Sequence, residues 1–169
     1  GTSFTNDASA TSVGTIDSSG STNQTAGFSI VSWTGTGSAG TVAHNLGNIP
    51  EWYVIKVRTG ESNNWAVYHH KSNANPEQYA LYLDGDSAAT DDSGLANDTA
   101  PTSTVFSLTN GNYGNGSSNT YIGYFFSEVQ GFSKFGSYEG NGNADGPFVY
   151  TGFKPAFIII KGYAGTDDW

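Results

Sequence analysis

Cysteine is absent from the 169 residues of this sequence. Without thiols the chain can form neither disulfides nor thiolate metal sites, so its stability must come from packing or from association of chains. No apolar run is long enough to cross a membrane, and no basic segment followed by an apolar one marks a signal peptide. The sequence therefore predicts no membrane insertion, but the lack of cysteine does not fix the compartment.

Positive charge is also scarce. Six Lys and Arg stand against fifteen Asp and Glu, which gives a net charge of −9. A surface of this sign repels phosphate backbones, so nucleic-acid binding is disfavoured. The same charge disfavours a purely electrostatic attachment to an anionic membrane or polysaccharide.

The residues that are abundant, Gly together with β-branched and aromatic types, favour strands and tight turns. Apolar stretches between Gly and Asn turns predict strands at residues 28–33, 41–44, 52–58, 65–69, 79–83, 102–108 and 121–129. Residues 52–58 and 121–129 are apolar on both faces, which indicates central strands, whereas the polar residues 84–100 predict an exposed loop. The pattern predicts an all-β fold, an antiparallel β-sandwich or jelly roll of the lectin-like type.

Residues 1–26 have a different composition. They are rich in Ser, Thr, Ala and Gly, and Phe4, Val13 and Ile16 are their only large apolar residues. This composition predicts a linker, or an extended N-terminal arm that pairs with a neighbour.

The most informative pattern is an internal repeat. Residues 27–65 (the first repeat) and residues 131–169 (the second repeat) both begin with Gly-Phe-Ser and end with Trp. The shared positions include Gly27/Gly131, Phe28/Phe132, Ser29/Ser133, Gly47/Gly152, Pro50/Pro155, Ile55/Ile160, Lys56/Lys161, Gly60/Gly165 and Trp65/Trp169. A period of about 104 residues fits a domain-sized unit.

We therefore expect a β-sandwich module at residues 27–130 and the start of a second module at residues 131–169. The second repeat is expected to form strands at 148–150 and 156–161 and to have the same shape as the first. It either completes the first sandwich or is a truncated module that needs chain beyond Trp169, because so short a stretch cannot build its own core.

Candidate binding residues lie among the aromatic and acidic side chains. Sugar rings stack on aromatic faces while acidic and amide groups bond their hydroxyls, so Tyr68, Tyr79 and Tyr113 are candidate exposed glycan contacts. Asp84 and Asp86 begin an Asp-x-Asp-x-Ser pattern that could hold calcium, although the remaining EF-hand positions are missing. An acidic hairpin turn is the simpler interpretation of this pattern, and the same applies to Asp91 and Asp92 and to Asp167 and Asp168.

No catalytic residues are predicted. The adjacent His69 and His70 would point to opposite faces of a strand, so they cannot chelate one metal by themselves. No nucleophile elbow is visible, and the carboxylates show no spacing that pairs them across a sugar. We expect a protein that is not an enzyme and that has no resident cofactor apart from possible calcium.

Three stretches are similar to those of a known family: residues 27–58, residues 97–108 and residues 120–161. They contain the His-x-Leu-Gly-x-x-Pro turn at residues 44–50 and the sequence SKFGSYEGNGNADGPFVYTGF. They resemble a domain of unassigned function that recurs in tail-fibre and other virion proteins of marine bacteriophages. The resemblance implies an extracellular appendage on the virion surface, a homotrimer that contacts other virion proteins and takes part in host attachment or in building a fibre. For attachment we expect weak contacts to a cell-surface glycan, summed by oligomerisation.

Three alternatives stay open. The chain could be a purely structural capsid decoration or fibre-shaft module. It could be a polysaccharide depolymerase. It could also be a subunit of an extracellular filament in which residues 1–26 donate a strand to a neighbour.

Overall fold

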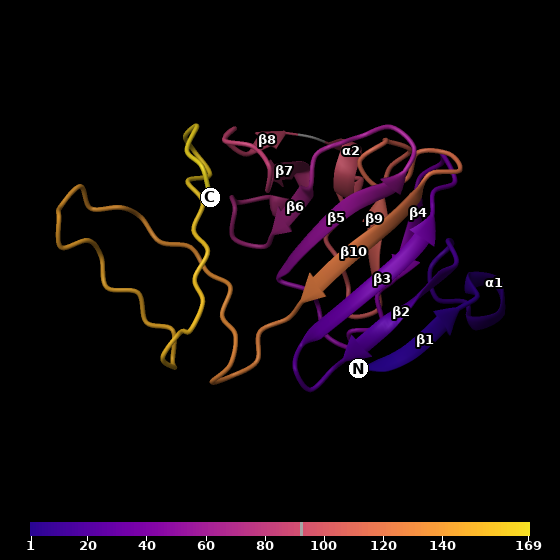
Figure 1. Cartoon of the computed structure of the whole chain (residues 1–169), viewed down its shortest axis with the longest axis horizontal. Coiled ribbons are helices and arrows are strands. Elements are labelled where there is room, and N and C mark those ends of the chain that lie inside the picture. Colours follow the sequence, from indigo (N-terminus) through magenta and orange to yellow (C-terminus); the bar gives the residue numbers. More distant parts are fainter. Residues whose placement is uncertain (92) are drawn as a thin grey trace.

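The computed structural model describes residues 1–91 and 93–169 (Figure 1). Asp92, which belongs to the loop expected at 84–100 and to the Asp91–Asp92 pair, lies outside the described residues. The elements in chain order are β1 (Thr2–Asn6), α1 (Ala8–Thr11), β2 (Ser18–Asn23), β3 (Phe28–Thr34), β4 (Gly40–Ala43), β5 (Trp52–Thr59), β6 (Ala66–His69), a 3-10 turn (Pro76–Gln78), β7 (Tyr79–Tyr82), β8 (Thr90–Asp91), α2 (Ser93–Ala96), β9 (Val105–Leu108) and β10 (Thr120–Phe126).

Two antiparallel sheets contain all the strands of the described residues. The large sheet has the order β1-β2-β3-β10-β5-β6-β7-β8, and β4 and β9 form the small sheet. The last long strand, β10, thus lies between β3 and β5 (Figure 1). The fold class is therefore the predicted one, an all-β antiparallel sandwich.

The core lies between the two sheets and is strongly aromatic. In β10, Tyr121 and Phe125 are fully buried while Ile122 and Tyr124 are half-buried on the opposite face, as strand alternation requires. The Phe125 ring lies 4.6 Å from that of Phe106 on β9. Burial of the inner face of β10 against β9 is what joins the two sheets.

The turn expected at residues 44–50 has a structural role in this core. His44 is fully buried, its Nδ1 accepts a hydrogen bond from the backbone N–H of Leu46 at 3.1 Å, and its Nε2 lies 3.1 Å from the Thr102 carbonyl oxygen. An imidazole that accepts at Nδ1 must be neutral and donate from Nε2. Burial lowers the pKa of His44 to about 4, only partly opposed by the bond to Thr102.

Residues 1–26 are not a linker in this structure. They are extended as expected, but β1 and β2 pair with each other and β2 pairs with β3 within the same chain. Ser and Thr are compatible with this position because one face of a hairpin at a sheet edge stays in water. Residues 84–100 also differ from a plain loop, because they include β8 and the short α2.

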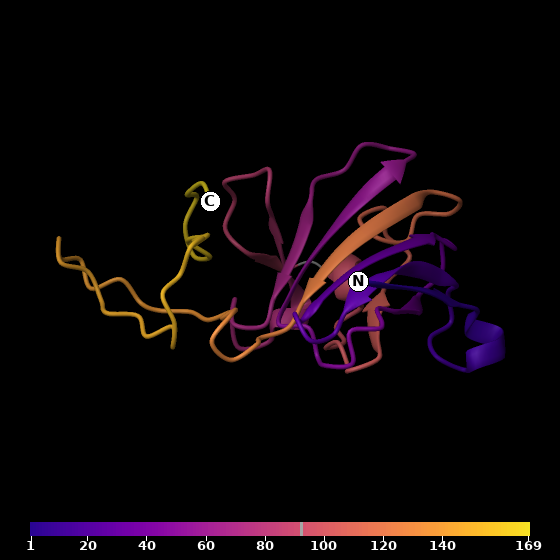
Figure 2. The same cartoon turned by 60° about the horizontal axis from the view of Figure 1, so that its bottom comes forward.

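The second repeat does not form the expected strands. Residues 148–150 and 156–161 carry no strand, and the second repeat neither completes the sandwich nor adopts the shape of the first repeat. Figure 2 shows this part of the chain leaving the end of β10, extending away from the sandwich and returning toward it. The expectation that both repeats share one shape is therefore wrong for this structure.

No helix among residues 1–91 and 93–169 is long and apolar enough to cross a bilayer.

Candidate functional site

The structure separates the five residues singled out from the sequence. Tyr68 lies on β6 and is only 3% exposed, with its ring stacked on that of Tyr53 at 4.7 Å. Desolvation, reinforced by the charges of Glu77 and Glu51, raises the pKa of Tyr68 to about 12. The prediction that Tyr68 is an exposed glycan contact is wrong, because alternation along β6 turns this side chain into the core.

Tyr79 and Tyr113 lie in different parts of the fold. Tyr79 begins β7 and pairs with Asp91 at the sheet edge. Tyr113 is half-buried in the loop between β9 and β10, where its ring lies 5.4 Å from that of Tyr82 at the other end of β7. The two tyrosines therefore do not share an exposed binding loop.

Asp84 and Asp86 follow β7 in an exposed turn. The Asp84 carboxylate accepts a hydrogen bond from the backbone N–H of Trp65 at 3.0 Å, and the Asp86 carbonyl oxygen accepts one from Lys161 Nζ at 3.0 Å. Over the described part of the chain, no group of three or more metal-ligating side chains is close enough to hold an ion. Calcium at Asp84 and Asp86 stays a prediction from the sequence.

An open hollow of about 500 Å³ lies elsewhere, on the outer face of the large sheet. It is lined by Thr5, Asn6, Asp7, Asp17, Ser18, Ser19, Ser32, Trp33, Thr34, Arg58 and Thr120. We call this hollow the outer-face groove. The antiparallel order β1-β2-β3-β10-β5 brings the end of β1, β3 and β5 together with the start of β2 and β10, which places residues from five strands at one corner.

Strand register explains why the outer-face groove is polar. Ser19 pairs with Ser32, and Thr120 pairs with Thr34, so hydroxyl groups face each other across β2, β3 and β10. The Ser19 and Ser32 Oγ atoms are 3.3 Å apart. The intervening Trp33 points into the core and donates its indole N–H to the Gly114 carbonyl oxygen at 2.8 Å. One face of β3 thus builds the core while the other builds the groove.

Two carboxylates of the groove are held by backbone N–H groups. Asp7 Oδ1 accepts from the Ser9 hydroxyl at 2.7 Å and from the Ala10 N–H at 3.0 Å, as the N-cap of α1. The hydrogen bonds from Ser9 and Ala10 hold the pKa of Asp7 below its usual range. Asp17 Oδ1 accepts from the Ala8 N–H at 2.9 Å. Both groups are therefore fixed acceptors at one end of the groove.

Arg58 supplies the positive charge of the groove. It is the only arginine of the sequence and lies exposed on β5. Among the hydrogen bonds and ion pairs of the described residues, none involves its guanidinium. Because a guanidinium has five donors and stays charged, it can bind a carboxylate in bidentate fashion or donate to several hydroxyls. The groove thus offers fixed acceptors, free donors and hydroxyls within one hollow.

Sequence reasoning missed this groove because it treated residues 1–26 as a linker. One local signal was available, since Asp7 before Ala-Ser-Ala-Thr is a typical N-cap. Nothing local places Arg58 and Asp17 in the same hollow, because that follows from the order of β2, β3, β10 and β5 in the large sheet.

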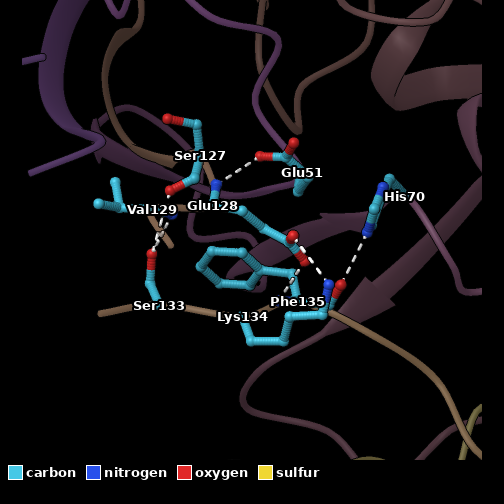
Figure 3. Close-up of polar contacts among 8 residues, drawn as sticks. All are labelled: Glu51, His70, Ser127, Glu128, Val129, Ser133, Lys134 and Phe135. Atoms are coloured by element: carbon cyan, nitrogen blue, oxygen red, sulfur yellow. Dashed lines mark hydrogen bonds and ion pairs between the residues drawn. The ribbon is translucent and has the colours of Figure 1, made fainter. Parts of the chain in front are cut away.

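A second polar cluster tethers the chain after β10 (Figure 3). Glu51 Oε2 accepts from the Glu128 N–H at 2.8 Å, and Glu128 in turn accepts from the Phe135 N–H at 2.9 Å and from Lys134 Nζ at 3.0 Å. Partial burial raises the pKa of Glu128, but the Phe135 and Lys134 contacts outweigh this effect and the pKa falls below its usual range. His70 Nε2 lies 2.9 Å from the Phe135 carbonyl oxygen. These contacts fix the first residues of the second repeat to the sandwich.

These features define a class, an all-β sandwich module with a polar groove on its outer sheet face. The chain belongs to the family described as Domain of unknown function (DUF7483), whose match spans residues 3–169. The match includes all of β1 except Thr2, together with β2 and both repeats. No curated protein and no solved structure matches the chain.

Proposed function

We propose that the chain is a module of a bacteriophage virion appendage, in a tail fibre or a fibre on the capsid, that takes part in host attachment by binding a cell-surface glycan. The resemblance of residues 27–58 and 120–161 to tail-fibre and other virion domains supports the appendage. The outer-face groove supports the glycan, because sugars present many hydroxyls that need fixed acceptors and donors together.

The observation that carries the binding proposal is one hollow that holds the exposed Arg58, two fixed carboxylates and a row of hydroxyls. The chain carries a net charge of −9, so long-range electrostatics disfavour an acidic polysaccharide. A single guanidinium inside the groove gives a local and directional contact instead. Assembly into a homotrimer would add the weak contacts of three such grooves.

The test is binding of the assembled protein to a glycan array and to polysaccharide from candidate hosts. We expect Arg58→Ala to weaken binding by roughly ten- to a hundredfold, since a hydrogen bond to a charged group contributes about 1.5–3 kcal/mol. Lys71→Ala is the matched control, because it removes one positive charge from an exposed site outside the groove. Equal losses in both variants would show that only net charge matters.

The other functions predict different results. An assembled protein that binds no glycan would favour a structural capsid or shaft module. Release of reducing ends from host polysaccharide would favour a depolymerase. If Arg58→Ala left glycan binding unchanged, the glycan would bind outside the groove, and only the proposed role in host attachment would stand.

A further inference from the structure

We propose that residues 131–169 are the acceptor half of a second sandwich, completed by a partner polypeptide segment that supplies strands of the β9 and β10 kind. This inference concerns assembly and does not depend on glycan binding. It rests on the pairing of the first repeat, on the position of β10, on the exposed side chains of the second repeat, and on its two tethers.

The strands of the first repeat do not pair with one another. β3 pairs with β2 and β10, β4 pairs with β9, and β5 pairs with β10 and β6. Every partner lies outside residues 27–65. A stretch with this sequence pattern therefore forms strands only when other segments supply the opposing edges.

The strand nearest to the second repeat cannot supply those edges. β10 ends at Phe126, only a few residues before the second repeat begins. Both of its edges are occupied, since Phe126 pairs with Phe28 on one side and with Trp52 on the other. The second repeat thus leaves the sheet without a strand to pair with.

The second repeat exposes the side chains that its counterpart buries. Ile55 is 0% exposed and Ile160, at the equivalent position, is 52% exposed. Tyr53 is 1% exposed, whereas Ile158 is 65% exposed. Phe148 is 91% exposed. Contiguous apolar side chains of this kind mark a surface that is covered in the functional assembly.

Both ends of the second repeat are nevertheless fixed to the sandwich. The cluster around Glu128 holds Lys134 and Phe135 at its start (Figure 3). At its end, Trp169 Nε1 donates to the Tyr82 carbonyl oxygen at 2.7 Å and the Ala89 N–H donates to the Tyr163 carbonyl oxygen at 2.8 Å. Tethered ends reduce the entropy that a partner strand must overcome when it orders the segment.

The first repeat defines what the partner must look like. Its β3 and β5 flank a single strand, Thr120–Phe126, that is apolar on both faces and paired along both edges. The second repeat has the corresponding segments near Phe132 and at residues 157–161. The partner therefore includes an extended segment with apolar residues on both faces, added by β-augmentation. It also includes a strand that pairs as β9 pairs with β4 in the first repeat.

The experiment extends the full chain after Trp169 with a second copy of its own residues 66–130. Amide hydrogen exchange at residues 157–161 is then compared with that of the unextended chain. We expect exchange there to slow by at least about a hundredfold, as for amides that enter a stable sheet. Sedimentation should show a monomer of the extended chain.

The matched control carries Tyr121→Ser and Phe125→Ser in the appended copy only. It should leave exchange at residues 157–161 as fast as in the unextended chain, because the appended strand then lacks its core-facing side. Equal exchange in the extended chain and in this control would overturn the proposal. So would slow exchange in the unextended chain together with a doubled or tripled mass, since a second copy of the chain would then be the occupant.

Discussion

Ile55 and Ile160 occupy equivalent positions of the two repeats, each after an apolar run and before a Lys, and have opposite surroundings in space. The first lies in β5 between β10 and β6, and the second lies in an extended segment without strand pairing. Lys56 and Lys161, which follow them, differ in the same way, since Lys161 bonds to the carbonyl oxygen of Asp86 in a turn. This sequence pattern therefore forms strands only where other segments cover their edges and one face, because an uncovered strand is not stable.

The largest expected effect is a difference in the free energy of unfolding between alanine variants of the two isoleucines. Ile55→Ala should lower the free energy of unfolding by roughly 3–4 kcal/mol, since it leaves a cavity at a fully buried site. Ile160→Ala should change it by less than about 0.5 kcal/mol, because the side chain is half exposed and makes no core contact. Urea unfolding of both variants measures the difference. Equal losses would mean that the second repeat is packed in solution.

A second difference is the response to acid, which should come from residues 27–130, because they contain all three histidines and the second repeat contains none. The buried His44 has a pKa of about 4 in the folded chain against about 6.5 when unfolded, so the unfolded state binds more protons between these values. Stability is therefore full above about pH 6.5 and falls as the pH drops toward 4, by up to about 3 kcal/mol.

The measurement is the free energy of unfolding in urea at a series of pH values. His69, whose pKa is also lowered to about 4 by burial and by the charge of His70, contributes in the same direction. His44→Gln isolates the His44 part, because it removes that titrating group and should reduce the slope by about half while His69 still titrates. An unchanged slope in this variant would contradict the prediction.

A third comparison concerns the backbone at the first glycine of each repeat. Gly27 and Gly131 both have positive φ, at +62° and +78°. A Cβ on Gly27 would lie 2.5 Å from the Ser127 carbonyl oxygen, whereas a Cβ on Gly131 would meet no atom within 4 Å. Gly27→Ala should cost at least about 2 kcal/mol of global stability, and Gly131→Ala about 1 kcal/mol of local strain.

Thermal unfolding of these two variants gives the global cost, and hydrogen exchange near Phe132 gives the local one. If Gly131→Ala lowered the free energy of unfolding more than Gly27→Ala, the second repeat and not the first would be the tightly packed one.

The smallest effect concerns the tether of the second repeat. Glu128→Gln removes the charge that binds Lys134 and weakens the bond to the Phe135 N–H. Because the ion pair is partly exposed, the loss should be below about 1 kcal/mol. It should appear as faster amide exchange at Phe135, with the exchange of β10 unchanged. Lys154→Ala, which removes an exposed charge in the middle of the second repeat, should have no such effect.

Much of the strand pattern could be predicted from the sequence. Residues 52–58 and 121–129 were expected to be central strands because both faces are apolar, and β5 and β10 are central in the large sheet. The repeat itself was also visible. Tyr68 was misplaced because its position on an inner or outer face depends on strand register, and residues 1–26 were misjudged because an edge hairpin needs few apolar residues.

The sequence by itself determined the class of fold, since alternating apolar residues and Gly-rich turns are compatible with little besides paired strands. Only the tertiary structure decided which of two matching stretches becomes part of a sheet. β10 takes both free edges, those of β3 and β5, and is itself paired on both sides. Hydrogen bonding between strands is a property of neighbours in space, so similar local sequences reach different structures when one of them finds its partner edges already taken.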